Sequence, residues 1–95
     1  MVKVVVKSEI KDGQIDAYRR LAAELARETR KEQGCVSYEL FQDIQNQNVF
    51  SFIEAWENQD LLDRHMTSEH FQRIVPQMAS LREKPAEINV YRLVL

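Results

Sequence analysis

The spacing of the apolar residues changes several times along this 95-residue chain, and each change marks a different secondary-structure element. A spacing of two is typical of a strand, and spacings of three and four are typical of a helix. Val2, Val4 and Val6 lie two positions apart. This spacing predicts a strand over residues 1–10, and the turn signal Asp12-Gly13 follows it.

A helix is predicted over residues 14–32, because apolar side chains recur three and four positions apart with good helix formers between them. These side chains are Ile15, Tyr18, Leu21, Ala22, Leu25 and Ala26. Gly34 is placed to end the helix. Basic residues alternate with Glu24, Glu28 and Glu32 at helical spacing, which predicts a solvated, ion-paired face. They are Arg19, Arg20, Arg27, Arg30 and Lys31.

The remaining sequence predicts a hairpin, two helical segments and a last strand. Residues 35–43 and 49–56 are rich in β-formers and are separated by polar residues. Asn58 can cap a short helix through Met66, and Thr67 or Ser68 can cap the next one. Pro76 lies inside that second helix and predicts a kink or an early end near residues 73–75. A strand is predicted after Pro85.

The resulting order, β-α-β-β-α-β, is that of an α+β, ferredoxin-like fold with an antiparallel sheet and helices on one face. A chain of 95 residues has room for one core, so we expect a single domain over residues 1–95. The uncovered face would expose apolar residues from several strands. Burial against a second copy is the simplest remedy, which predicts a homodimer.

Composition limits the classes of partner. The net charge of −2 gives no electrostatic reason to expect nucleic acid. The run Val4 to Val6 is too short to cross a membrane, and the N-terminus lacks the apolar stretch of a secretory signal. We therefore expect a cytoplasmic protein that does not contact membranes. Cys35 is the only cysteine, so no internal disulfide or cysteine-based metal site is expected.

A group of aromatic residues shares one side of the predicted third strand with a carboxylate. Phe50, Phe52, Glu54 and Trp56 alternate along that strand and therefore point the same way. The simpler interpretation is an edge of the core with Glu54 near its rim. The alternative is the lining of a ligand pocket.

His65 follows Leu61 and Leu62 at helical spacing, so it should lie on the inward side of its helix. There an imidazole could accept a proton from a ligand hydroxyl, or it could simply pack and form a hydrogen bond. His70 is expected at a helix start, as a capping or surface group. The two histidines are five positions apart, which does not match a helical zinc pair, so no metal site is expected.

Two further kinds of site are not expected. With two glycines in the chain, no dinucleotide-binding turn can form, and no bound nucleotide cofactor is indicated. No serine lies in the context of a nucleophile elbow.

The segment from Glu54 through Trp56 and His65 to His70 and Phe71 resembles the signature of the antibiotic biosynthesis monooxygenase family. Residues 34–38 and Asp43 resemble that family's second strand. The resemblance covers essentially the whole chain. It implies a dimeric α+β barrel in which the uncovered sheet faces pack together, with a pocket in each subunit between its sheet and its helices.

The resemblance also separates the family's branches. The Asn, Trp and His positions of haem-degrading members hold Val6, His65 and Val75 here, which argues against haem degradation. Of the Asn, Trp, Tyr and Arg set of the polyketide oxidases, only Trp56 has a counterpart. Glu54, His65 and His70 are closest to the quinol monooxygenases and to the isomerase that processes a phosphorylated autoinducer-2 signal.

The expected function is cofactor-independent oxygenation of a hydroquinone or polyphenol by molecular oxygen. His65 would accept the phenolic proton, and Glu54 would orient that imidazole or fix a ligand hydroxyl. The expected ring-binding residues are Tyr38, Phe52, Trp56 and Phe71, with His70 beside them. The alternatives are an isomerase acting on a small phosphorylated hydroxyketone and a non-enzymatic ligand-binding dimer. An RNA-recognition domain has this element order, but no basic, glycine-containing strand motif is present.

Overall fold

The computed structural model describes residues 1–95 and contains four strands and three helices. Their order and bounds are β1 (Val2–Glu9), α1 (Ile15–Thr29), β2 (Cys35–Gln42), β3 (Val49–Trp56), α2 (Gln59–Met66), α3 (Glu69–Ala79) and β4 (Glu87–Arg92). The predicted ferredoxin-like α+β fold is confirmed, and so are the two predicted helices between β3 and β4.

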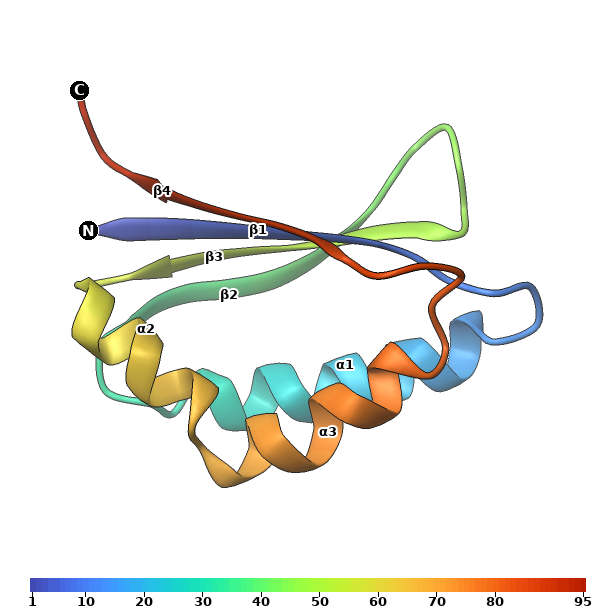
Figure 1. Cartoon of the computed structure of the whole chain (residues 1–95), viewed down its shortest axis with the longest axis horizontal. Coiled ribbons are helices and arrows are strands. Elements are labelled where there is room, and N and C mark those ends of the chain that lie inside the picture. The colour runs from blue at the N-terminus through green and yellow to red at the C-terminus, as the bar shows by residue number, and fades with distance from the viewer.

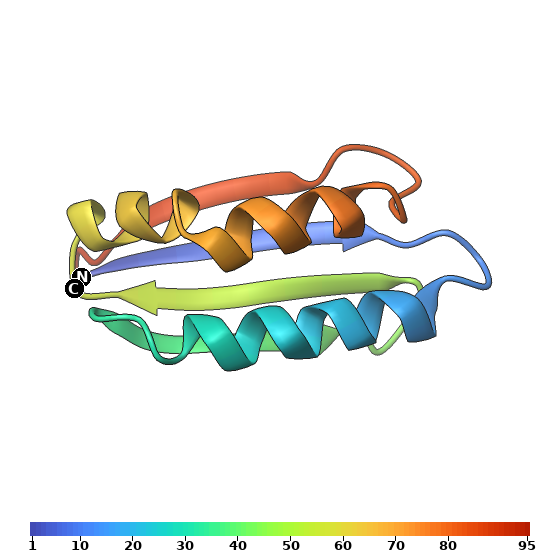
Figure 2. The ribbon, with the colours of Figure 1, turned by 90° about the horizontal axis from the view of Figure 1, so that it is seen from below.

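The strands form one antiparallel sheet in the order β2-β3-β1-β4. All three helices cover one face of this sheet, and the opposite face is bare in the single chain (Figure 1). Figure 2 shows α1 beside α2 and α3 beneath the strands. Alternate side chains of β1 and β3 therefore point to the helices, and Val4, Phe50 and Phe52 are buried there with Trp56.

The short helices begin where the sequence predicts. The Asn58 side chain accepts a hydrogen bond from the Leu61 backbone N–H at 2.9 Å, and this caps α2. Ser68, not Thr67, caps α3 by accepting from the Phe71 N–H at 3.3 Å. Because Ser68 and Thr67 separate α2 from α3, the two histidines belong to different helices.

The structure corrects two predicted helix ends. The helix α3 does not end before Pro76 but continues to Ala79. Ile74 and Met78, on either side of the proline, are both buried in the core, and this packing offsets the lost hydrogen bond. The helix α1 ends at Thr29 instead of reaching Glu32, which lies in the turn before β2.

Gly34 belongs to that same turn and has a positive φ of 86°. A Cβ at this position would lie 2.3 Å from Leu61 Cδ1, so the turn packs closely under α2. This close packing brings Glu32 to the helix that carries His65.

No helix in the chain combines the length and the apolar character needed to cross a bilayer.

Candidate active site

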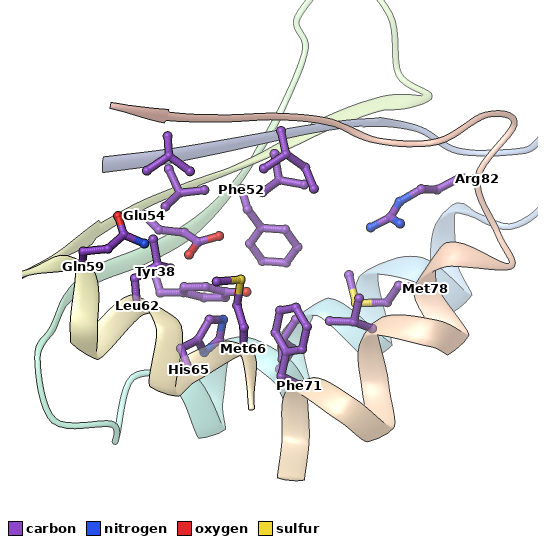
Figure 3. A pocket seen from close by; sticks show the side chains of 16 residues that line it. Tyr38, Phe52, Glu54, Gln59, Leu62, His65, Met66, Phe71, Met78 and Arg82 are labelled. Carbon is purple, nitrogen blue, oxygen red and sulfur yellow. The ribbon is translucent and has the colours of Figure 1, made fainter. Parts of the chain in front are cut away.

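A cavity of about 170 Å³ lies between the covered face of the sheet and the helices α2 and α3 (Figure 3). Sixteen residues line it, and twelve of them are hydrophobic. An apolar cavity of roughly 150 Å³ is large enough to hold benzene. The cavity therefore suits a ligand with one small ring. Its polar lining consists of Glu54, Gln59, His65 and Arg82.

His65 is buried on α2 with 2% of its surface exposed. Its ring centroid lies 4.8 Å from that of Trp56, 5.1 Å from that of Phe71 and 5.5 Å from that of Tyr38. This apolar surrounding disfavours the imidazolium and lowers the pKa of His65 below its usual value, even though Glu32 opposes the shift. The imidazole is therefore neutral at neutral pH.

Glu32 determines which nitrogen of His65 carries the proton. His65 Nδ1 lies 2.7 Å from Glu32 Oε2, and a carboxylate can only accept a hydrogen bond. The neutral ring therefore donates from Nδ1 and keeps its lone pair on Nε2. No protein group forms a hydrogen bond with Nε2, and His65 lines the cavity. This tautomer suits a group that accepts a proton from a ligand.

The expectation that Glu32 belongs to an ion-paired helix face is therefore wrong. Glu28 does pair with Lys31, at 3.2 Å, but Glu32 binds the two histidines. The sequence pattern missed this role because it extended the helix to residue 32, whereas α1 ends at Thr29. Gly34 was the available signal, since a glycine that needs a positive φ marks a turn before the strand.

His70 is the second histidine that binds Glu32. Its Nε2 is 2.7 Å from Glu32 Oε2 and 3.2 Å from Ser68 Oγ. The hydroxyl of Ser68 in turn donates to the His65 carbonyl oxygen at 2.6 Å. His70 thus supports Glu32 and does not line the cavity.

Glu32, His65 and His70 form a cluster whose ligand atoms all lie within 4.8 Å of one another, close enough to hold a metal ion. The spacing argument against a metal site assumed that one helix carries both histidines, and it does not apply to residues on α2 and α3. In the structure these atoms are joined by hydrogen bonds of 2.7 Å. Those hydrogen bonds hold the His65 ring in one orientation, and this explains the cluster without a metal ion.

Glu54 is a second titratable group of the cavity. Its Oε1 accepts a hydrogen bond of 3.0 Å from Trp56 Nε1. Burial raises the pKa of Glu54 to about 7, although the bond from Trp56 acts in the other direction. Glu54 is thus partly protonated near neutral pH and can either donate to or accept from a ligand oxygen. No hydrogen bond joins it to His65, whose partner is Glu32.

The structure brings most of the expected site residues together. Tyr38, Phe52, Glu54, His65 and Phe71 line the cavity. Trp56 is fully buried against His65 and Glu54, and His70 binds Glu32, but neither Trp56 nor His70 lines the cavity. Burial also raises the pKa of the Tyr38 hydroxyl well above its usual value, so this residue stays neutral. Sequence reasoning missed Gln59 and Arg82, which no local pattern distinguishes from exposed polar residues.

Comparison with known families shows to which family the chain belongs. The model of the family described as antibiotic biosynthesis monooxygenase matches residues 1–77. Twelve of the sixteen cavity residues lie in this range, and the other four are Met78, Arg82, Ile88 and Val90. The chain belongs to this family.

Individual relatives are similar to this chain over most of its length. The uncharacterized protein sll1783 of Synechocystis is 32% identical over 90% of this chain, which spans 58% of the length of that protein. A crystal structure of an antibiotic biosynthesis monooxygenase has a TM-score of 0.95 and 35% identity, with 100% of both chains covered. A conserved protein of Methanosarcina mazei has a TM-score of 0.95 and 34% identity, over 96% of this chain and 90% of its own.

Proposed function

We propose that this chain is a cofactor-independent monooxygenase that oxidises a small hydroquinone or polyphenol. The arrangement of Glu32, His65 and the cavity is the observation that carries this proposal. A neutral imidazole with its proton fixed on Nδ1 keeps its Nε2 free of protein hydrogen bonds, and this side chain lines an apolar cavity. That is the geometry that a general base for a phenolic hydroxyl requires. Membership of the monooxygenase family supports the same reaction class.

The reaction begins when His65 Nε2 takes the phenolic proton. The phenolate is electron-rich and gives one electron to molecular oxygen, which leaves a phenoxyl radical and superoxide. Their recombination forms a carbon–oxygen bond, and loss of water then yields a quinone. One oxygen atom enters the product and the other leaves as water, so the substrate supplies all the electrons. The protein has to bind and deprotonate the substrate, and no external reductant is needed.

Each lining group has a part in this scheme. Tyr38, Phe52 and Phe71 provide an apolar site of the size of one ring. Glu54 lies in the same cavity, and its partly protonated carboxyl can hold a substrate oxygen. Glu32 stabilises the imidazolium that forms when His65 takes the proton, because its carboxylate lies 2.7 Å from Nδ1.

An isomerase acting on a hydroxyketone is the second candidate. Proton transfer between neighbouring carbons needs a base and an acid near neutral pKa. Glu54, whose pKa is about 7, could serve as the acid, and His65 could serve as the base. The two candidates differ in a simple way, since only the oxygenase consumes molecular oxygen.

We further propose that two copies of the chain pair through the bare sheet face. Val5 and Ile53 are paired neighbours on this face and are only half-buried in the single chain. Phe41 and Tyr91 on the outer strands are about half exposed, at 49% and 52%. A second copy would cover these side chains.

Oxygen uptake by metal-free protein over a panel of hydroquinones and polyphenols tests the proposed reaction. The His65→Ala variant should lose at least about 100-fold in rate, because a general base contributes that much. Added imidazole should restore part of the rate by filling the vacated position. The Arg64→Ala variant, changed at an exposed neighbour on the same helix, is the control. Uptake that survives in His65→Ala would contradict the assignment of the base, and no uptake on any substrate would favour the isomerase.

A further inference from the structure

We propose that Arg82 forms an anion-binding subsite in the cavity and that the natural ligand carries a carboxylate or phosphate group. This inference rests on the proposed function for the identity of the other end of the ligand. Arg82 lines the cavity, and Figure 3 shows its guanidinium reaching in from the end opposite Glu54 and Gln59. Because His65 is neutral, Arg82 is the only cationic group among the lining residues.

The guanidinium of Arg82 has no acidic partner in the chain. Its only side-chain hydrogen bond runs from Nε to Ser8 Oγ, at 3.0 Å. Arg73 provides the contrast, because it binds Glu24 and Glu69 at 2.6 Å each. An unpaired arginine on an open surface is common, but Arg82 is half-buried beside apolar side chains. A positive charge in such a position is costly unless an anion meets it.

The backbone holds Arg82 in place. The amide of Lys11 donates to the Leu81 carbonyl at 2.9 Å, and the amide of Glu83 donates to the Glu9 carbonyl at 2.9 Å. These bonds lie on both sides of Arg82 and pair it with Ile10. Ser8, which fixes Nε, is itself buried with 1% of its surface exposed. The subsite is therefore organised before a ligand arrives.

The free part of the side chain suits a planar or tetrahedral oxyanion. With Nε bound to Ser8, the two terminal nitrogens still offer N–H groups in a fork, which matches the two oxygens of a carboxylate or phosphate. Glu54 at the other end repels an anion whenever it is ionised. A ligand would therefore bind with its anionic group at Arg82 and its hydroxyl toward His65.

Binding of three matched probes tests this inference without reference to turnover. The probes are 4-hydroxybenzoate, its neutral analogue 4-hydroxybenzamide and 4-hydroxyphenyl phosphate. Affinity is measured by calorimetry and by the fluorescence of Trp56, the only tryptophan, whose ring packs against His65. A charged hydrogen bond predicts that at least one anionic probe binds roughly 10-fold or more tighter than the amide.

The Arg82→Gln variant should lose this preference, and Arg82→Lys should keep part of it. Arg20→Gln removes the same charge from an exposed position of α1 and should change nothing. Thermal unfolding of each variant shows whether it folds, and the lysine variant remains informative if the glutamine variant does not fold. A preference for 4-hydroxybenzoate indicates an aromatic acid as ligand, whereas a preference for the phosphate indicates a phosphorylated one.

Equal affinity of the wild-type protein for the anions and the amide would overturn the inference. So would a preference that survives in Arg82→Gln, or a failure of all three probes to bind. The outcomes also separate this inference from the proposed function. An anion preference without oxygen uptake on any substrate would leave the subsite in place and refute the oxygenase. Oxygen uptake on neutral hydroquinones without any anion preference would refute the subsite alone.

Discussion

Replacing Glu32 by glutamine removes one charge from a residue that contacts His65 but does not line the cavity. The imidazolium formed during the reaction would lose a carboxylate that lies 2.7 Å from Nδ1. Opposite charges about 4 Å apart attract by about 4 kcal/mol at an effective dielectric constant of about 20. Water screens part of this attraction, because 17% of the Glu32 side chain is exposed. We therefore expect a loss of about 2.7 kcal/mol, which corresponds to a roughly 100-fold lower kcat.

The pattern of the loss distinguishes a positioning residue from a structural one. KM should stay near its wild-type value, because Glu32 does not touch the substrate. Glu32 also raises the pKa of His65 against the effect of burial. The Glu32→Gln variant should therefore have a lower His65 pKa, and the low-pH limb of kcat/KM should move to lower pH.

Steady-state oxygen uptake between pH 5 and 9 is the assay for Glu32→Gln. Glu28→Gln is the matched control, since Glu28 lies near the end of α1 and forms salt bridges only with the exposed Arg27 and Lys31. A Glu32→Gln variant with a kcat within about threefold of the wild type would refute the reasoning, as would a change in KM alone.

Two other substitutions test the cavity and the sheet face. Burial raises the pKa of Glu54 from 4.5 to about 7. Between these two pH values the folded chain keeps a proton on Glu54 that the unfolded chain has released. The free energy of unfolding therefore falls as pH rises above 4.5. Glu54→Gln should raise the free energy of unfolding by about 3 kcal/mol at pH 8 and by much less at pH 4, and equal effects in urea unfolding at both pH values would contradict this. Ile53→Lys should convert the proposed dimer to monomers in sedimentation or light scattering, and Ala23→Lys on the exposed side of α1 should not. A wild-type monomer would contradict the dimer.

Local patterns were sufficient to predict the elements of the fold. The alternation of Val2, Val4 and Val6 and the helical spacing between residues 15 and 26 each reflect burial on one face, which the structure confirms. The capping residues Asn58 and Ser68 have their own local signals. The early end predicted near Pro76 is wrong because the gain from burying Ile74 and Met78 depends on tertiary packing, which propensity does not include.

The candidate site was only partly predictable for a related reason. Residues of one strand or helix face, such as Phe52, Glu54 and His65, could be placed from periodicity. Glu32 and Arg82 lie outside regular elements and reach the site through turns. Their partners His65 and Ser8 lie 33 and 74 positions away along the chain, so no local pattern connects them.

Isotope labelling under oxygen-18 gas tests most directly whether this chain is a monooxygenase that uses His65 as its base. Metal-free protein and a hydroquinone that it consumes are reacted, and the product quinone and the water are analysed by mass spectrometry. The account predicts one labelled atom in the quinone and one in water, with both signals lost in His65→Ala. An unlabelled quinone, or labelling that persists in the variant, would contradict it.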